Sequence, residues 1–473
     1  MMKHSALAFI ALSLGVHASA FAKEPEYETA PAAAAGMCPP PGWQENLGSF
    51  QKPDAAFPTQ DTLPVPTPDC NFHEWSFEAY VWATALDANG TPRFLTLPTP
   101  DDLLSTNAKA AEIGPRTLKL AARSLMPHGS AGYTEGAGAI VEADGNVLVG
   151  PNGYPVLASV HMNQSYFATA KKNLIVTNGY ATQPQDSSFE TGAAVFKATW
   201  LRLAPGDKPP AGAYVTEAEV PVLTVLRTKT SIAILPVAGQ FVKAQVALVG
   251  LHVVGSTVNH PEFLWATFEH KLNAPAVADN TFSPSPTAKN PNAFTFYAAN
   301  TPFSTVNTDN VPPALTFDLR SQRFAPVNNV VVENRTGGEN QTGGQANVLS
   351  VNASGQTFLA GEPAPQSLFA NYNLGGTVWM APKSYNLNSN QTNAVGSVNL
   401  ANTTAETFVQ EARNQPIANV QNCFTCHNPT SYSFQQSPPP LANRLIALSH
   451  VLAYGSPYAV PNLITGRVTT NLR

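Results

Sequence analysis

The sequence predicts an α+β protein with a β-rich body, short helices and a helical C-terminal segment. Proline is abundant (42 residues in 473) and only 12% of the residues are charged, which is typical of many strands and turns rather than long exposed helices. The apolar, β-branched runs Val195–Leu203 and Phe241–Val254 have the character of strands, and the second is continuous enough to be expected buried on both faces. Helical patterns flank a cysteine motif near the C-terminus.

The N-terminus has the pattern of a secretory signal. Lys3 precedes an apolar run over residues 6–16, and two tripeptides that fit the small-x-small cleavage pattern, Ala18–Ala20 and Ala20–Ala22, follow. We expect residues 1–22 to be a cleaved signal peptide, so that the mature protein is periplasmic or secreted in a bacterium. The apolar run is too short to span a bilayer, and no transmembrane segment is expected after its removal. The mild net charge of −5, without a basic patch, argues against nucleic-acid binding.

Residues 23–69 are a Pro- and Ala-rich arm, for which we expect an irregular path. Two of the four cysteines, Cys38 and Cys70, lie far from the C-terminal motif. In an oxidising compartment the simple expectation is one disulfide between them that pins the arm. The alternative is two unpaired, buried thiols.

Residues 70–275 are expected to form the β-rich body. Aromatic and small apolar residues at helical spacing predict an amphipathic helix over residues 70–82, with its aromatic face in the core. A second helix is plausible over residues 117–126. Asn163 is expected to cap a third helix through its side-chain oxygen.

Residues 276–400 are poor in charge and rich in Asn, Thr, Gly and Pro, which predicts loops and short strands such as the edge strand Thr377–Met380. So long an irregular stretch is unusual in a compact domain, and we expect it to wrap the core. Residues 401–473 are expected to be helical. A capping-box pattern at Thr403–Glu406 predicts one helix start, and a leucine stripe predicts a helix over residues 441–454.

The C-terminal segment contains Cys423, Cys426 and His427 in a C-x-x-C-H arrangement. This is the spacing for covalent attachment of haem c, because thiols about one helical turn apart reach the two vinyl groups of one haem. The adjacent imidazole supplies a neutral nitrogen ligand to the iron. A zinc site would require two further ligands at suitable spacing, and a redox dithiol would require a βαβ setting; neither is evident, although a structural disulfide is a further alternative. The sequence therefore predicts one covalent haem c.

The second axial ligand of that iron is less well defined. His450, on the helix expected over residues 441–454, is the first candidate, and Met380 is a weaker one. An open or water-bound position is the third possibility. Two protein ligands favour electron transfer, whereas an open position admits peroxide or oxygen.

A group of histidines and glutamates within the body offers weak candidates for catalysis: His252, Glu269 and His270. Their spacing matches no zinc pattern, and buried histidines with satisfied hydrogen bonds are the more common explanation of such a group. If Glu269 and His270 lie on a strand, they point to opposite faces. His73 and Glu74 are the next candidates.

Several stretches resemble a family of large, exported bacterial cytochrome c family proteins. The resemblance rests on the C-x-x-C-H motif and on more loosely similar stretches, which are Cys70–Ser76, Pro155–Tyr166, Gly250–Val254, His260–His270 and Leu400–Thr407. It implies a single covalent haem near the C-terminus of a larger body, and it implies no substrate and no catalytic residue.

These observations favour one-electron redox chemistry, either as an electron carrier or as the haem subunit of a periplasmic oxidoreductase. The expected partner is a redox protein or a small-molecule electron donor or acceptor. One alternative is a haem enzyme of peroxidase type, whose distal site the β-rich body would build. Another is a non-catalytic haem-bearing sensor or binding protein.

Overall fold

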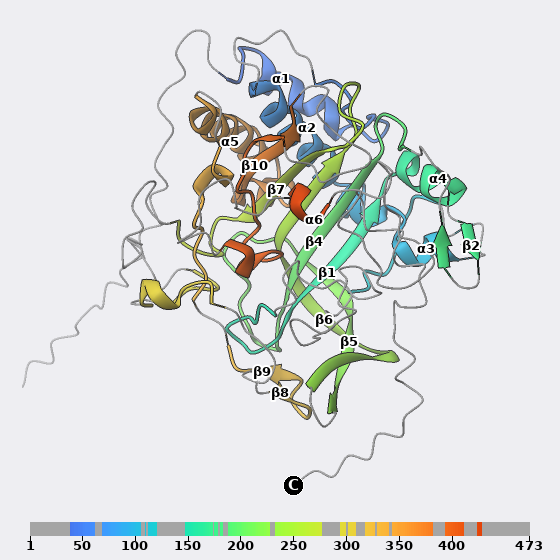
Figure 1. Cartoon of the computed structure of the whole chain (residues 1–473), viewed down its shortest axis with the longest axis vertical. Coiled ribbons are helices and arrows are strands. Elements are labelled where there is room, and N and C mark those ends of the chain that lie inside the picture. The colour runs from blue at the N-terminus through green and yellow to red at the C-terminus, as the bar shows by residue number, and fades with distance from the viewer. Residues whose placement is uncertain are drawn as a thin grey trace, which may run out of the picture.

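The computed structural model describes residues 38–61, 69–105, 109, 112–120, 147–173, 175–177, 180–182, 188–227, 232–276, 294–298, 301–308, 317–326, 329–339, 343–381, 393–410 and 423–427. Within these residues the fold is α+β, with an antiparallel sheet as the body and short helices around it (Figure 1). The expected signal peptide and the expected helix over residues 441–454, which carries His450, lie outside the described residues.

A seven-stranded sheet organises the described part of the chain, in the order β1-β4-β6-β7-β10-β11 with β5 paired to β6. Every pairing in it is antiparallel. Its strands are β1 (Val156–Met162), β4 (Ala194–Arg202), β5 (Val215–Arg227), β6 (Ile232–Gly255), β7 (Leu264–His270), β10 (Tyr372–Met380) and β11 (Ala394–Gly396). Two small hairpins pair β2 (Ile175–Thr177) with β3 (Tyr180–Thr182) and β8 (Phe317–Asp318) with β9 (Arg323–Phe324).

The described helices are short apart from two. The α-helices are α1 (Trp43–Asn46), α2 (Cys70–Thr84), α3 (Pro100–Leu104), α4 (Gln164–Asn173), α5 (Gly344–Ala360) and α6 (Cys423–Cys426). The 3₁₀ helices are η1 (Leu47–Gln51), η2 (Arg93–Thr96), η5 (Phe303–Thr305), η6 (Arg335–Gly337), η7 (Gln366–Asn371) and η8 (Thr407–Gln410). No helix in the described ranges is long and apolar enough to cross a membrane.

One face of the sheet packs against α2 and carries the larger hydrophobic core. Tyr80 of α2 stacks on Phe268 of β7 with ring centroids 4.0 Å apart, and Trp82 stacks on Phe196 of β4 at 5.8 Å. Figure 1 shows α1, α2 and α5 together at the top of the view, whereas α6 lies in front of the middle strands. The two faces of the sheet therefore have separate coverings.

Several expectations from the sequence are confirmed. The helix expected over residues 70–82 is α2, and the strand expected at residues 195–203 is β4. Asn163 caps α4, because its Oδ1 accepts a hydrogen bond from the amide of Tyr166 at 2.9 Å. The expected disulfide between Cys38 and Cys70 is present, and it ties the arm to the first residue of α2.

Other expectations are corrected. The run at residues 241–254 belongs to a longer strand, β6, and its first residues are not buried: Phe241 keeps 43% of its surface accessible. The start of the helix expected over residues 117–126 is wrong, because residues 117–120 are not helical and Lys119 forms a bridge with Glu219; residues 121–126 lie outside the described part. Pairing with β5 overrides the local helical pattern there.

The low-charge stretch contributes more regular structure than its composition indicates. β10 lies inside the sheet between β7 and β11, so Thr377–Met380 is not an edge strand. α5 runs for 17 residues where loops were expected. Gly355 in its interior explains part of this, because a Cβ there would collide with the ring of Phe77 on α2. The close packing of two helices, rather than helix propensity, stabilises α5.

The stack between Tyr80 and Phe268 makes a testable contribution to stability. Phe268 is fully buried, so Phe268→Ala should lower the free energy of unfolding in urea by about 3–5 kcal/mol, through lost transfer energy and the cavity left behind. Phe241→Ala, at an exposed position of the same sheet, should cost below about 1 kcal/mol. Equal losses for the two variants would contradict the assignment of Phe268 to the core.

Candidate functional site

The C-x-x-C-H motif forms one helical turn that rests on the second face of the sheet. Cys423–Cys426 make up α6, and the amide of His427 donates to the carbonyl of Cys423 at 2.7 Å. The side chain of Phe424 is fully buried. The ring centroid of His427 lies 4.3 Å from that of Trp265 on β7. Aromatic contacts thus hold the motif against the middle of the sheet (Figure 1).

An apolar row crosses the sheet beneath this motif. The strand register places five residues opposite one another in turn, Met162, Val195, Val254, Trp265 and Val378. Residues opposite one another share a face, so the row is continuous. All five belong to one buried cluster that also contains Phe424 and that packs against Cys423. The motif therefore lies over a surface with little access to water.

Two methionines belong to the same cluster. Met380, the weaker candidate for the second axial position, follows Val378 by two residues on β10, so it shares the face of the motif and is fully buried. Met162 at the end of β1 is equally buried and belongs to the same cluster. Sequence reasoning missed Met162, because its proximity to the motif depends on strand pairings that no local pattern reveals.

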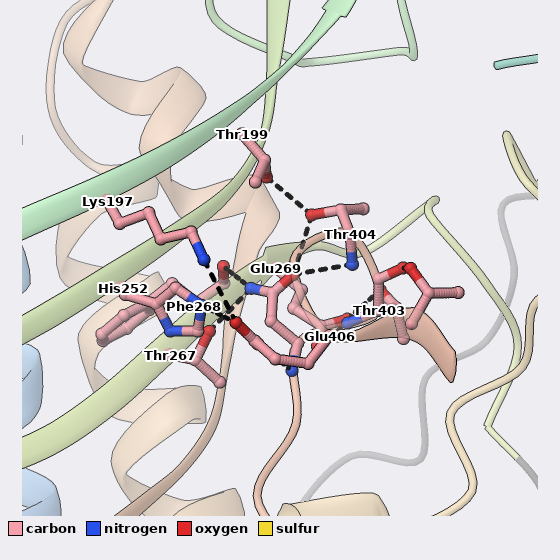
Figure 2. Close-up of polar contacts among 11 residues, drawn as sticks. Lys197, Thr199, His252, Thr267, Phe268, Glu269, Thr403, Thr404 and Glu406 are labelled. Carbon is pink, nitrogen blue, oxygen red and sulfur yellow. Dashed lines mark hydrogen bonds and ion pairs between the residues drawn. The ribbon is translucent and has the colours of Figure 1, made fainter. Parts of the chain in front are cut away.

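A polar cluster lies one pleat repeat farther along the strands, on the same face (Figure 2). Lys197, His252 and Thr267 are opposite one another on β4, β6 and β7. Glu406 lies over them: its Oε1 is 3.1 Å from His252 Nε2 and 3.5 Å from Lys197 Nζ. We call Lys197, His252, Glu269 and Glu406 the carboxylate cluster.

Glu406 is the ionised member of this cluster. Burial disfavours its charged form, but His252 and Lys197, together with a hydrogen bond from the amide of Asn402 at 3.1 Å, outweigh that penalty and lower the pKa of Glu406 to about 2. The cluster therefore carries a fixed negative charge at neutral pH beside two basic side chains.

Glu269 has the opposite tendency. Its carboxylate accepts hydrogen bonds from the amide of Thr403, at 2.8 Å, and from the hydroxyl of the same residue. Burial is the largest effect and raises the pKa of Glu269 to about 7, against those hydrogen bonds and with a smaller contribution from the charge of Glu406. Two carboxyl groups covered by one loop thus differ strongly in proton affinity.

The loop that carries Thr403 and Glu406 lies close to the sheet because Gly250 has no side chain. A Cβ at Gly250 would lie 2.5 Å from the hydroxyl oxygens of Thr199 and Thr404. Those two hydroxyls are 2.6 Å apart and hydrogen-bonded, which links the loop to β4. A glycine at this position is therefore required for the carboxylate cluster to form.

The loop differs from the expected helix start. Asn402, rather than Thr403, acts as the cap: its Oδ1 accepts from the amide of Thr404 at 2.8 Å, and its amide donates to Glu406. Thr403 instead turns its hydroxyl toward Glu269. The helical part within the described residues is the 3₁₀ turn η8. Competition from buried partners on the sheet explains the difference.

The structure brings two of the three weak catalytic candidates together. His252 and Glu269 lie on the same face, beneath residues 402–406 (Figure 2). His270 points to the opposite face, where its ring lies 5.2 Å from that of Tyr372, and burial lowers its pKa to about 3. Glu269 and His270 are adjacent on strand β7 and point to opposite faces, as expected for a strand. Lys197 and Glu406 complete the cluster and were not predicted from the sequence. Glu406 has the position of an ordinary helix-capping residue, and no local pattern marks Lys197.

The raised pKa of Glu269 makes stability depend on pH. Between the ordinary value of 4.5 and about 7, the folded protein retains a proton that the unfolded chain loses. The free energy of unfolding of the wild type should therefore fall, relative to Glu269→Gln, by up to about 3 kcal/mol as the pH rises from about 5 to about 8. Urea denaturation at both pH values measures this. Glu217→Gln replaces a carboxylate with 57% of its side chain exposed, and its free energy of unfolding should change with pH as that of the wild type does. If the free energy of unfolding of the wild type instead changed with pH as that of Glu269→Gln does, the raised pKa of Glu269 would be contradicted.

No family model, no curated protein and no solved structure matches this chain. The candidate site is therefore defined by two features of the chain itself. These are the helical turn α6 on its apolar row and the adjacent carboxylate cluster, which share one face of the sheet.

Proposed function

We propose that the chain is an exported protein that carries one covalent haem c and works in one-electron redox chemistry. Cys423 and Cys426 would form the thioether bonds, and His427 would ligate the iron. When bound, the haem supplies a reversible one-electron couple. The partner would be a redox protein or a small-molecule electron donor or acceptor.

The observation that carries the proposal is the docking of α6 on the apolar row. A porphyrin needs thiols at one-turn spacing, an adjacent imidazole and an apolar wall, and α6 combines the first two over a buried cluster that includes Trp265 and Phe424. The 4.3 Å contact between the rings of Trp265 and His427 orients the imidazole. Partial burial of Cys423 against the cluster limits the access of water to its sulfur.

The carboxylate cluster would contribute charge and protons near this site. Glu406 holds a negative charge between His252 and Lys197, and one pleat repeat, about 7 Å, separates the row of His252 from the row of Trp265. Glu269, with a pKa of about 7, can gain or lose a proton near neutral pH. A redox centre beside such a carboxyl group would have a potential that depends on pH.

The same cluster favours a second candidate, a haem enzyme of peroxidase type. Such chemistry requires a general base and a polarising cation, and His252 and Lys197 are side chains of those classes on the face of the motif. The distinguishing property is access to the iron. A carrier with two protein ligands keeps its ferric spectrum in the presence of peroxide or cyanide, whereas an enzyme with an open position does not.

Covalent attachment is the first test. The protein, matured in a periplasm competent for c-type cytochrome assembly, should be coloured and heavier by one haem that acid–acetone extraction does not remove. Cys423→Ala with Cys426→Ala should abolish the bound haem, because no thioether can form. The matched control replaces Cys38 and Cys70, the disulfide pair, with serine and should leave haem attached. A colourless wild type with the mass of the bare chain would contradict the proposal.

The second axial ligand can be identified by substitution. His450→Ala is expected to convert a low-spin ferric spectrum into a high-spin one, since it removes a strong-field ligand. Met380→Ala and Met162→Ala test the two buried methionines of the same cluster in the same way. A wild type that is already high-spin and reacts rapidly with peroxide would favour the peroxidase candidate over the carrier.

A further inference from the structure

A second group of metal-ligating side chains lies on the opposite face of the sheet from α6. It comprises Asp69, just before α2, His73, one turn into α2, and Glu339, after η6. One ligand-type atom from each lies within 4.8 Å of the other two, and all three residues are buried. The four-residue spacing of Asp69 and His73 places both on one side of the helix start.

The hydrogen bonds around His73 define which ring nitrogen carries its proton. Ser76 Oγ donates to the carbonyl of Phe72 at 2.8 Å, so its single proton is used there. Thr377 Oγ1, at 2.6 Å from Ser76 Oγ, must then be the donor in that contact. Thr377 Oγ1 consequently accepts at 3.1 Å from Nδ1–H of His73. In the neutral imidazole, Nε2 therefore carries a lone pair.

That lone pair faces a carboxylate. His73 Nε2 is 3.2 Å from Glu339 Oε2, has no exposed surface, and makes no hydrogen bond within the described part of the chain. An imidazolium would donate a proton from Nε2, and the contact does not have the geometry of such a bond. Two electron-rich atoms at this separation repel each other unless a cation lies between or beside them.

The surroundings have the form of a second coordination shell. Ligating histidines usually donate their other ring N–H to an oxygen, as His73 does to Thr377, and ligating carboxylates are in turn hydrogen-bonded. Asn347 of α5 donates to Asp69 Oδ2 at 2.9 Å. Each of these two ligands thus has a buried partner from a different element that orients it.

We infer that Asp69, His73 and Glu339 bind a divalent first-row transition metal ion of the zinc class. One imidazole nitrogen and two carboxylates are a donor set that Zn²⁺ accepts, whereas Mg²⁺ and Ca²⁺ prefer oxygen ligands alone. The ion joins the start of α2 to the segment before α5, so its role is structural. This site is independent of the proposed haem, which belongs to the other face of the sheet.

Zinc uptake by the full-length, mature protein tests this inference. After treatment with chelator and dialysis against micromolar ZnCl₂, the wild type should retain one Zn²⁺ per chain by atomic emission, with iron measured separately, and should melt at a higher temperature than the chelated protein. Asp69→Asn and Glu339→Gln should lose the bound zinc and the thermal shift. A wild type that retains no zinc would overturn the inference.

Two further variants separate metal binding from folding. Thr377→Val keeps all three ligands but removes the acceptor of His73 Nδ1–H, and it should weaken zinc affinity by about 10–100-fold. Glu262→Gln is the matched control. Glu262 is buried and lies 2.8 Å from His260, but this pair has no third metal-ligating group among the described residues. The Glu262→Gln variant should therefore bind zinc as the wild type does. Unchanged affinity in Thr377→Val, or loss of zinc in Glu262→Gln, would overturn the site even if Glu339→Gln failed to fold.

Discussion

The antiparallel pairing of β7 with β6 and β10 is the constraint on which both proposed sites depend. Successive residues of a strand point to opposite faces, and the register of these three strands aligns the faces across the sheet. Trp265 and Glu269 consequently lie on the face of α6, whereas Phe268 and His270 lie on the face of α2. A shift of this register by one residue would exchange the two environments completely.

The two faces solve the problem of buried charge in different ways. On the face of α6, Glu406 is stabilised by two basic side chains, and Glu269, whose pKa burial raises to about 7, keeps its proton in mildly acidic solution. On the face of α2, Asp69 and Glu339 lie beside an imidazole whose orientation Thr377 determines. Burial is costly for a carboxylate: on the face of α2, Asn347 donates a hydrogen bond to Asp69, and the proposed metal ion would offset the charge of Glu339.

The features that the sequence predicts are those with local causes. The spacing of Cys423, Cys426 and His427, the helical repeat of α2 and the capping by Asn163 each depend on residues within a few positions. The Cys38–Cys70 disulfide was predicted because these are the two cysteines outside the C-terminal motif, but other features that depend on distant partners were missed. α5 forms because Gly355 admits the ring of Phe77, although its composition favours loops. The same limit applies to the site, where Glu406 meets His252 across a separation of 154 residues.

The long separations also bear on how the chain reaches its native state. His73 and Thr377 are hydrogen-bonded although 304 positions apart, and Asn347 meets Asp69 across 278. Such a topology has a high contact order, for which loop-closure entropy slows folding. Trp82 of α2 lacks its stacking partner Phe196 until β4 has been synthesised, and Tyr80 lacks Phe268 until β7 has been synthesised. The nascent chain therefore exposes aromatic side chains of α2 until β7 has emerged, and transiently exposed apolar surface of this kind promotes aggregation.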